Sequence, residues 1–206
     1  MISNFSNISK CKLSVLSGII IGLSYPPSPF GFLAWFGLIP LIHVLFSSSI
    51  GDSIKWSFVT GLIVNVITVY WFGLNSGAGV VPALISMVAA ILYLSIFWIL
   101  FGFLSSWYNK ITGHGLSLVP LIWVFTEFLR GFGPLSFPWI NLALTQTFCL
   151  PLVQIADVTG SMGISFWIVL LNVIIYTAIR SKNVEIKILY MGGLLVLVIY
   201  LLGYFR

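Results

Sequence analysis

Long apolar runs recur along almost the whole chain, and they constrain its fold more than any other feature. Hydrophobic residues make up 60% of the 206 residues and charged residues only 6%, whereas soluble domains contain about 45–50% apolar residues. An α-helix needs about 20 predominantly apolar residues to cross the hydrocarbon core of a bilayer. The sequence therefore predicts an all-α, polytopic integral membrane protein and argues against a soluble globular fold.

Turn residues and polar loops divide the apolar sequence into about seven expected transmembrane helices. We expect one membrane domain over residues 1–206, without a soluble domain. The expected spans are residues 13–23, 32–46, 56–72, 81–107, 116–129, 163–179 and 188–204. Residues 131–159 are apolar too, but Pro134, Pro138 and Pro151 interrupt them. We expect this segment to be partly re-entrant or interfacial, because non-helical backbone at membrane depth is tolerated only when it packs against protein or water.

The distribution of basic residues predicts the orientation in the membrane. If the N-terminus is cytoplasmic and the spans alternate, seven basic residues are cytoplasmic and two are external, as the positive-inside rule requires. The cytoplasmic set is Lys10, Lys12, Lys55, Lys110, Arg180, Lys182 and Lys187, and the external set is Arg130 and Arg206. We therefore expect an external C-terminus and an external segment 131–159. The scattered basic residues form no stripe, so the net charge of +5 does not indicate a nucleic-acid partner.

Glu127 and Arg130 are the most informative charged residues, because they lie three positions apart in a nearly uncharged, tryptophan-rich stretch. A charged side chain at the bilayer centre costs roughly 2.5–3.5 kcal/mol on insertion scales, so the pair lies near an interface or has a function. One interpretation is an ion pair at a partly wet, external helix end. The other is that Arg130 binds a phospholipid or lipoprotein headgroup through its planar guanidinium.

Four further residues complete the set of candidate substrate-binding residues. Pro138 and Trp139 belong either to a packed interfacial loop or to one wall of a cleft that admits lipid. Gln154 and Asp157 are interpreted first as loop-capping groups before a helix that starts near Gly160, and second as part of the same cleft. The two cysteines, Cys11 and Cys149, have no metal-binding spacing, so we expect no metal site and no cofactor.

Four motifs, taken in order, carry a resemblance to a known family. They are Tyr25-Pro26-Pro27 followed by residues 33–41 (LAWFGLIPL), Trp123…Glu127…Arg130-Gly131, Phe137-Pro138-Trp139, and residues 154–166 (QIADVTGSMGISF). This series resembles the N-terminal membrane part of bacterial apolipoprotein N-acyltransferases. The resemblance implies a bacterial inner-membrane protein whose partners are phospholipid and diacylated lipoprotein.

Members of that family transfer an acyl chain from a phospholipid to the α-amino group of the N-terminal cysteine of a lipoprotein. Their chemistry takes place in an external nitrilase-like domain, where a Cys is the nucleophile, a Glu the general base and a Lys stabilises charge. Here the sequence stops at Arg206, where that domain would begin. The resemblance therefore implies a truncated or split form whose catalytic half lies on another polypeptide or is lost.

No catalytic residue is assigned to this chain. Cys149 has apolar neighbours, which do not favour the reactive thiolate, and Cys11 is expected on the cytoplasmic side. Two other functions stay open at this point. One is a non-enzymatic lipid-binding or scaffold membrane protein, and the other is a small transporter, which only the in-membrane polar residues and the Gly and Pro breaks favour.

Overall fold

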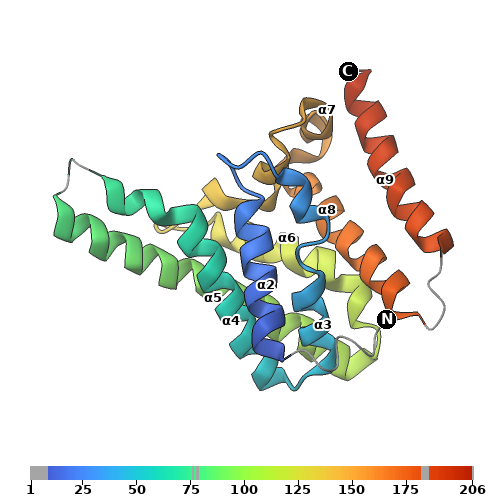
Figure 1. Cartoon of the computed structure of the whole chain (residues 1–206), viewed down its shortest axis with the longest axis horizontal. Helices are drawn as coiled ribbons and strands as arrows, with labels where there is room; N and C mark the ends of the chain where they lie inside the picture. The colour runs from blue at the N-terminus through green and yellow to red at the C-terminus, as the bar shows by residue number, and fades with distance from the viewer. Residues whose placement is uncertain (1–8, 76, 78, 182–185, 206) are drawn as a thin grey trace.

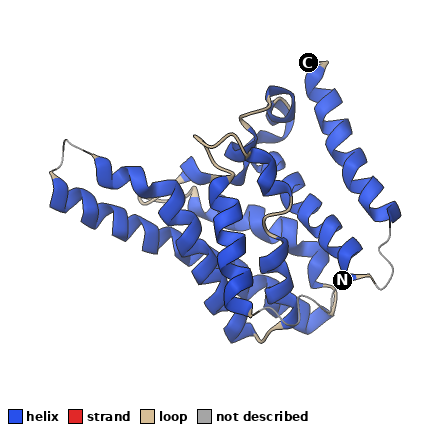
Figure 2. Cartoon of the chain, in the orientation of Figure 1, coloured by secondary structure: helices blue, strands red, loops and turns tan. Residues whose placement is uncertain are grey.

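The computed structural model describes residues 9–75, 77, 79–181 and 186–205. These residues form helices joined by turns and loops, and no strand occurs among them (Figure 2). The predicted all-α fold class is confirmed. The α-helices are α2 (Lys10–Leu23), α3 (Ile39–Ser47), α4 (Ile50–Val69), α5 (Val80–Thr112), α6 (Val119–Arg130), α7 (Leu150–Val153), α8 (Ala156–Arg180) and α9 (Ile186–Tyr204). The 3-10 helices are η1 (Gly31–Trp35), η2 (Tyr70–Leu74), η3 (Gly115–Leu118), η4 (Pro138–Ile140) and η5 (Leu142–Gln146).

Four of these helical segments are long and apolar enough to cross a membrane. They are Ile50–Leu74, Val80–Thr112, Ala156–Arg180 and Ile186–Tyr204. The prediction of about seven spans is not confirmed. Residues 32–46 divide into η1 and α3, and α2 and α6 have only 14 and 12 residues. At 1.5 Å per residue these two helices extend about 21 and 18 Å, less than the roughly 30 Å of the hydrocarbon core.

Local sequence explains where the helices begin and end. The Ser9 and Ser49 hydroxyls accept hydrogen bonds from the backbone N–H groups of Lys12 and Asp52, so serine caps α2 and α4. Prolines stand in the first turns of α3, α6 and α7, where the missing N–H would have no partner in the helix anyway. Several prolines that interrupt the apolar sequence are therefore helix starts.

One end of the molecule gathers the basic helix termini. Lys10 at the start of α2 forms an ion pair with Asp52 at the start of α4, with 2.8 Å between Nζ and Oδ2. Lys110 near the end of α5 lines a cavity with the residues that link α3 to α4. Arg180, the last residue of α8, lines a cavity with the end of α3. We call this the basic end; it lies at the bottom of Figure 1.

The opposite end carries the proline-rich loops. Tyr25, which follows α2, donates a hydrogen bond from its hydroxyl to the Ile140 carbonyl at 2.9 Å, so residues 24–30 lie against the segment 131–155. The last turn of α9 packs on α7 at this end, where Gly203 meets the Pro151 backbone. We call this the proline-rich end; α7 and the end of α9 lie at the top of Figure 1.

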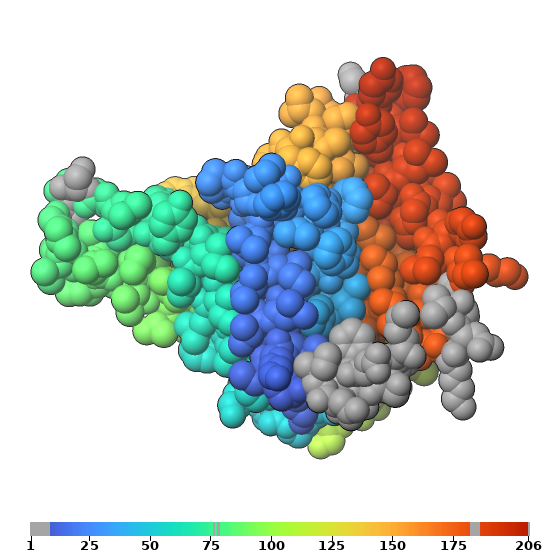
Figure 3. Space-filling view, in the orientation of Figure 1, coloured from blue at the N-terminus to red at the C-terminus, as the bar shows by residue number. Residues whose placement is uncertain are grey.

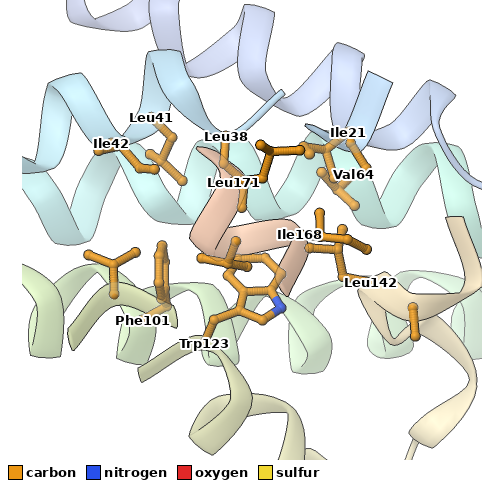
Figure 4. Packing of buried hydrophobic residues seen from close by; sticks show 14 of the residues in the cluster. Ile21, Leu38, Leu41, Ile42, Val64, Phe101, Trp123, Leu142, Ile168 and Leu171 are labelled. Carbon is orange, nitrogen blue, oxygen red and sulfur yellow. The ribbon is translucent and has the colours of Figure 1, made fainter. Parts of the chain in front are cut away.

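The hydrophobic core lies where α2, α3, α4, α5, α6 and α8 converge. Figure 4 shows side chains from all six helices packed together, among them Leu41, Phe101, Trp123 and Ile168. On the face drawn in Figure 3, α2 and the segment leading to α3 are central, the α4–α5 hairpin projects to one side, and α9 lies along the opposite edge. The core is thus built by three helices too short to span a bilayer alone, α2, α3 and α6, together with the long helices α4, α5 and α8.

Two glycines allow α2 to pack closely against α4. A Cβ atom built on Gly18 would lie 2.8 Å from the Cβ of Ile63, and one on Gly22 would lie 2.6 Å from the Cδ1 of Ile67. The Gly-x-x-x-Gly spacing in α2 therefore allows α4 to approach, as small residues do between membrane helices.

We predict that Gly18→Ala destabilises the protein, because Ile63 is fixed by its own helix and cannot move aside. Overpacking of this kind typically costs about 1–3 kcal/mol. Gly51→Ala is the matched control, since a Cβ at Gly51 would meet no atom within 4 Å and alanine favours helix. Thermal unfolding of the purified protein in detergent measures both; equal melting temperatures for the two variants would contradict the prediction.

Candidate functional site

Glu127 and Arg130 lie in the last turn of α6, and both are buried inside the protein. Their exposed fractions are 2% and 5%, and Nη2 of Arg130 lies 3.8 Å from Oε1 of Glu127. The expectation of a partly wet helix end is therefore corrected. The reason is that the chain after α6 folds back over the pair, which the spacing of the two residues alone does not reveal.

Glu127 holds two separate parts of the chain through one oxygen. Its Oε1 accepts a hydrogen bond from Nε1 of Trp123 at 3.0 Å and another from the backbone N–H of Leu142 at 2.7 Å. Trp123 lies one turn earlier on α6, whereas Leu142 begins η5. A carboxylate in apolar surroundings is tolerated when it is paired and hydrogen-bonded, and Glu127 meets both conditions.

Arg130 holds the two residues that precede Leu142. Its Nη2 donates to the carbonyl oxygen of Ile140 at 3.2 Å and to Oδ1 of Asn141 at 2.8 Å. Together, Glu127 and Arg130 fix three successive residues of an irregular segment against α6. We call this arrangement the clamp, defined as Glu127, Arg130 and residues 140–142.

The clamp has unused hydrogen-bonding capacity. Within the described part of the chain, Oε2 of Glu127 and Nε of Arg130 are buried without a hydrogen-bond partner. The two side chains also line a narrow pocket with Trp98, Phe101 and Trp123. A free carboxylate oxygen and a free guanidinium N–H in this setting suit one small polar group or an ordered water.

Pro138 and Trp139 lie just before the clamp, at the surface. Trp139 is 62% exposed, and its ring lies 6.4 Å from Trp71 and 5.3 Å from Phe137, measured between ring centroids. The contact between Trp139 and Trp71 joins η4 to η2, which follows α4. An exposed tryptophan at the end of a membrane protein is typical of the aromatic belt at headgroup level.

Gln154 and Asp157 lie apart from the clamp, on the other side of α7. Both are exposed, and they flank residues that line a groove between the start of α8 and the end of α9. The groove has a volume of about 670 Å³ and is lined by Ile155, Val158, Thr159, Val198, Leu201, Leu202 and Phe205. The structure therefore places the six candidate residues in two groups: Glu127, Arg130, Pro138 and Trp139 at or near the clamp, and Gln154 and Asp157 beside the groove.

The start of α8 differs slightly from the expectation of a helix beginning near Gly160. The helix begins at Ala156, but Gly160 has φ 66° and ψ −179°, which is not helical. A side chain at this φ and ψ would be strained, so glycine suits the break. The first turn, which carries Asp157 and one wall of the groove, is thereby set off from the rest of α8.

Two buried amides, Gln146 and Asn172, hold η1 and the residues that lead into α3. The sequence places Gln146 in the same packed loop or cleft wall as Trp139, whereas it assigns no role to Asn172. Oε1 of Gln146 accepts from Nε1 of Trp35 at 2.8 Å. The side chain of Asn172 accepts from the Leu38 N–H at 2.9 Å and donates to the Ala34 carbonyl at 2.7 Å. The only sequence signal for Asn172 is a lone amide in the apolar run 163–179.

Comparison with known proteins identifies the family. A family model described as the apolipoprotein N-acyltransferase N-terminal domain matches residues 17–174, which include the entire clamp. The chain belongs to the apolipoprotein N-acyltransferase family. The resemblance stated from the sequence motifs is confirmed, and the family together with the four apolar helices marks a bacterial membrane protein.

Individual relatives extend this result. Proteins named apolipoprotein N-acyltransferase are 35% identical over 176 residues in Geobacter metallireducens and 32% identical over 186 residues in Thermotoga maritima. The alignments cover 82% and 83% of this chain, but only 33% and 36% of the relatives. The relative from Pasteurella multocida is 27% identical over 168 residues, 80% of this chain and 32% of its own length. The chain thus spans about a third of the relatives that it matches.

We predict that Glu127→Ala is strongly destabilising. The change leaves the Arg130 guanidinium buried without a carboxylate and removes the acceptor for the Leu142 N–H. Loss of one partner of a buried pair typically costs about 3–5 kcal/mol. Asp52→Asn is the control, because it also removes an ion-paired carboxylate, but from an exposed pair at the basic end. Thermal unfolding in detergent should show a large loss for Glu127→Ala and almost none for Asp52→Asn; similar losses would argue against the clamp.

Proposed function

We propose that this chain is the membrane part of an apolipoprotein N-acyltransferase, which binds phospholipid and diacylated lipoprotein at its proline-rich end. The match of the family model over residues 17–174 carries this proposal. Acyl transfer itself is assigned to a nitrilase-like catalytic part, in the same protein or on a separate polypeptide. No residue of this chain is assigned as the nucleophile, since Cys11 lies at the basic end and Cys149 is half-buried among apolar neighbours.

In this proposal the groove between α8 and α9 holds an acyl chain. Its volume of about 670 Å³ lies within the roughly 300–1,000 Å³ of typical ligand pockets, and all its lining residues except Thr159 are apolar. Gln154 and Asp157 lie beside it and offer an amide and a carboxylate. The carboxylate suits the α-amino group of a lipoprotein, and the amide suits an ester oxygen of either substrate.

The clamp has a positioning role in this proposal. Arg130 is 5% exposed and already donates to Ile140 and Asn141, so direct headgroup binding would first require these bonds to break. Glu127 and Arg130 instead fix the segment that carries Pro138 and Trp139. The exposed Trp139 then forms a wall for lipid at the membrane surface.

We further propose that the proline-rich end is external to the bacterial inner membrane and that the basic end is cytoplasmic. Support comes from Lys10, Lys12, Lys110 and Arg180, which belong to helix termini at the basic end, whereas Arg130 lies toward the other. Lys182 and Arg206, which entered the sequence count, lie outside the described residues. The positive-inside rule then orients the molecule.

Reporter insertions test the orientation. Alkaline phosphatase inserted after Gly133, in the loop that follows α6, should be active, because the enzyme folds only outside the cytoplasm. The same insertion after Ser49, between α3 and α4, should be inactive. Activity at residue 49 and none at residue 133 would reverse the assignment.

Filling the groove tests the lipid site. Leu201→Trp places a bulky ring in the groove, whereas Leu194→Trp changes an exposed residue of the same helix that does not line it. We expect Leu201→Trp to reduce phospholipid co-purification by about tenfold, which corresponds to roughly 1.4 kcal/mol of binding free energy. Leu194→Trp should retain the wild-type amount. Native mass spectrometry measures both, and equal lipid retention would exclude the groove as the acyl site.

A chimera separates lipid binding from catalysis. The chain alone should bind phospholipid but not acylate a diacylated lipoprotein peptide. Joined to the remaining two thirds of the Geobacter metallireducens relative, it should support acylation. Binding without acylation in a folded chimera would favour a non-enzymatic lipid-binding role.

A further inference from the structure

A cavity at the basic end takes no part in the proposed acyl transfer. It lies between α3 and α8, at the opposite end of the molecule from the clamp and the groove, and has a volume of about 220 Å³. It is lined by Ile39, His43, Phe46 and Ser47 from α3 and by Tyr176, Ile179 and Arg180 from α8.

Two pairs of polar side chains face each other across this cavity. His43 and Ser47 lie four residues apart on α3, and Tyr176 and Arg180 lie four residues apart on α8, so each pair shares one face of its helix. The Tyr176 hydroxyl lies 3.4 Å from Nδ1 of His43. Tyr176 is buried, whereas Arg180 is exposed at the last residue of α8. The cavity therefore has a hydroxyl and an imidazole inside and a cationic group at its mouth.

The charges around the cavity favour an anion. Among the described residues none of those that line it is acidic. Asp52 is paired with Lys10, and Glu127 belongs to the clamp at the other end. Glu185 follows Arg180 by five positions but lies outside the described residues, so the experiment below includes it.

We propose that this cavity binds the phosphate of an anionic phospholipid in the leaflet at the basic end. A guanidinium suits phosphate because its planar fork donates two hydrogen bonds. The Tyr176 hydroxyl supplies another donor when Nδ1 of His43, 3.4 Å away, carries the imidazole proton. Basic pockets between membrane helices on the cytoplasmic side bind anionic headgroups in the same way. Ile39, Phe46 and Ile179 form apolar walls, which suit the lipid carbons next to the phosphate and would contribute nothing to a free anion.

This site is independent of the acyl-transfer proposal. The groove between α8 and α9 would hold a substrate at the proline-rich end, whereas the lipid here joins α3 to α8 at the basic end. Its expected consequence is stabilisation, because a ligand that binds only the folded state raises the unfolding free energy.

The test uses the whole purified chain, titrated with phosphatidylglycerol or with zwitterionic phosphatidylcholine. Native mass spectrometry counts bound lipid, and thermal unfolding reports stabilisation. Phosphatidylglycerol should bind and raise the melting temperature more than phosphatidylcholine. Arg180→Gln should weaken phosphatidylglycerol binding by about tenfold or more, the factor expected from losing a charge-assisted hydrogen bond. Tyr176→Phe, which keeps the ring and its packing, should weaken binding by a smaller factor.

Lys110→Gln is the matched control, because Lys110 is a basic residue at the same end that lines a different cavity. It should keep wild-type phosphatidylglycerol binding. Equal losses for Arg180→Gln and Lys110→Gln would mean general attraction to anionic lipid and would overturn the proposal. Displacement of the lipid by millimolar inorganic phosphate would indicate a free-anion site and would overturn the lipid assignment. A tenfold gain of bound lipid in Glu185→Gln would show that the Glu185 carboxylate pairs with the Arg180 guanidinium in the wild-type protein. That result would also overturn the proposal.

Discussion

The structure depends on buried polar side chains that satisfy irregular backbone within an apolar protein. The segment 131–149 and residues 34–38 lie outside the α-helices, so their N–H and C=O groups need partners from elsewhere in the chain. Glu127 accepts from Leu142, and Arg130 donates to Ile140. In the same way, the buried Asn172 side chain accepts from the Leu38 N–H and donates to the Ala34 carbonyl. Without these contacts, non-helical backbone in such apolar surroundings would be costly.

The same constraint explains which parts of the fold could be predicted from the sequence. The all-α class follows from apolar composition, and the close approach of α4 to α2 agrees with the spacing of Gly18 and Gly22. The number of spans could not be counted in this way. Hydropathy marks residues 32–46 as one apolar run, but it does not reveal that the chain turns between η1 and α3 and is held there by Asn172, 134 residues away from Leu38. Contacts of this range depend on the tertiary fold.

In the candidate site, too, some features could be predicted from the sequence and others depend on the tertiary fold. Scarcity of charge was enough to single out Glu127 and Arg130, and their i, i+3 spacing indicated a pair. Their burial was not predictable, because it arises when residues 140–142 fold back over α6. Gln154 and Asp157 were chosen from the same segment as Pro138 and Trp139, yet α7 separates them, and they lie beside a groove whose other wall is α9. Residues close in sequence thus belong to different parts of the surface. The order of residues in the segment does not reveal this separation.

The backbone break at Gly160 has a geometric consequence for α8. A helix changes direction where its backbone hydrogen-bond ladder is interrupted. The body of α8, from residue 161 onwards, is fixed by its packing against α6 and by Asn172. Its first turn, which carries Val158 and Thr159, is joined to that body through a single residue with φ 66°. The orientation of that turn, and with it one wall of the groove, is therefore set by the φ and ψ of Gly160 and not by the axis of the helix body.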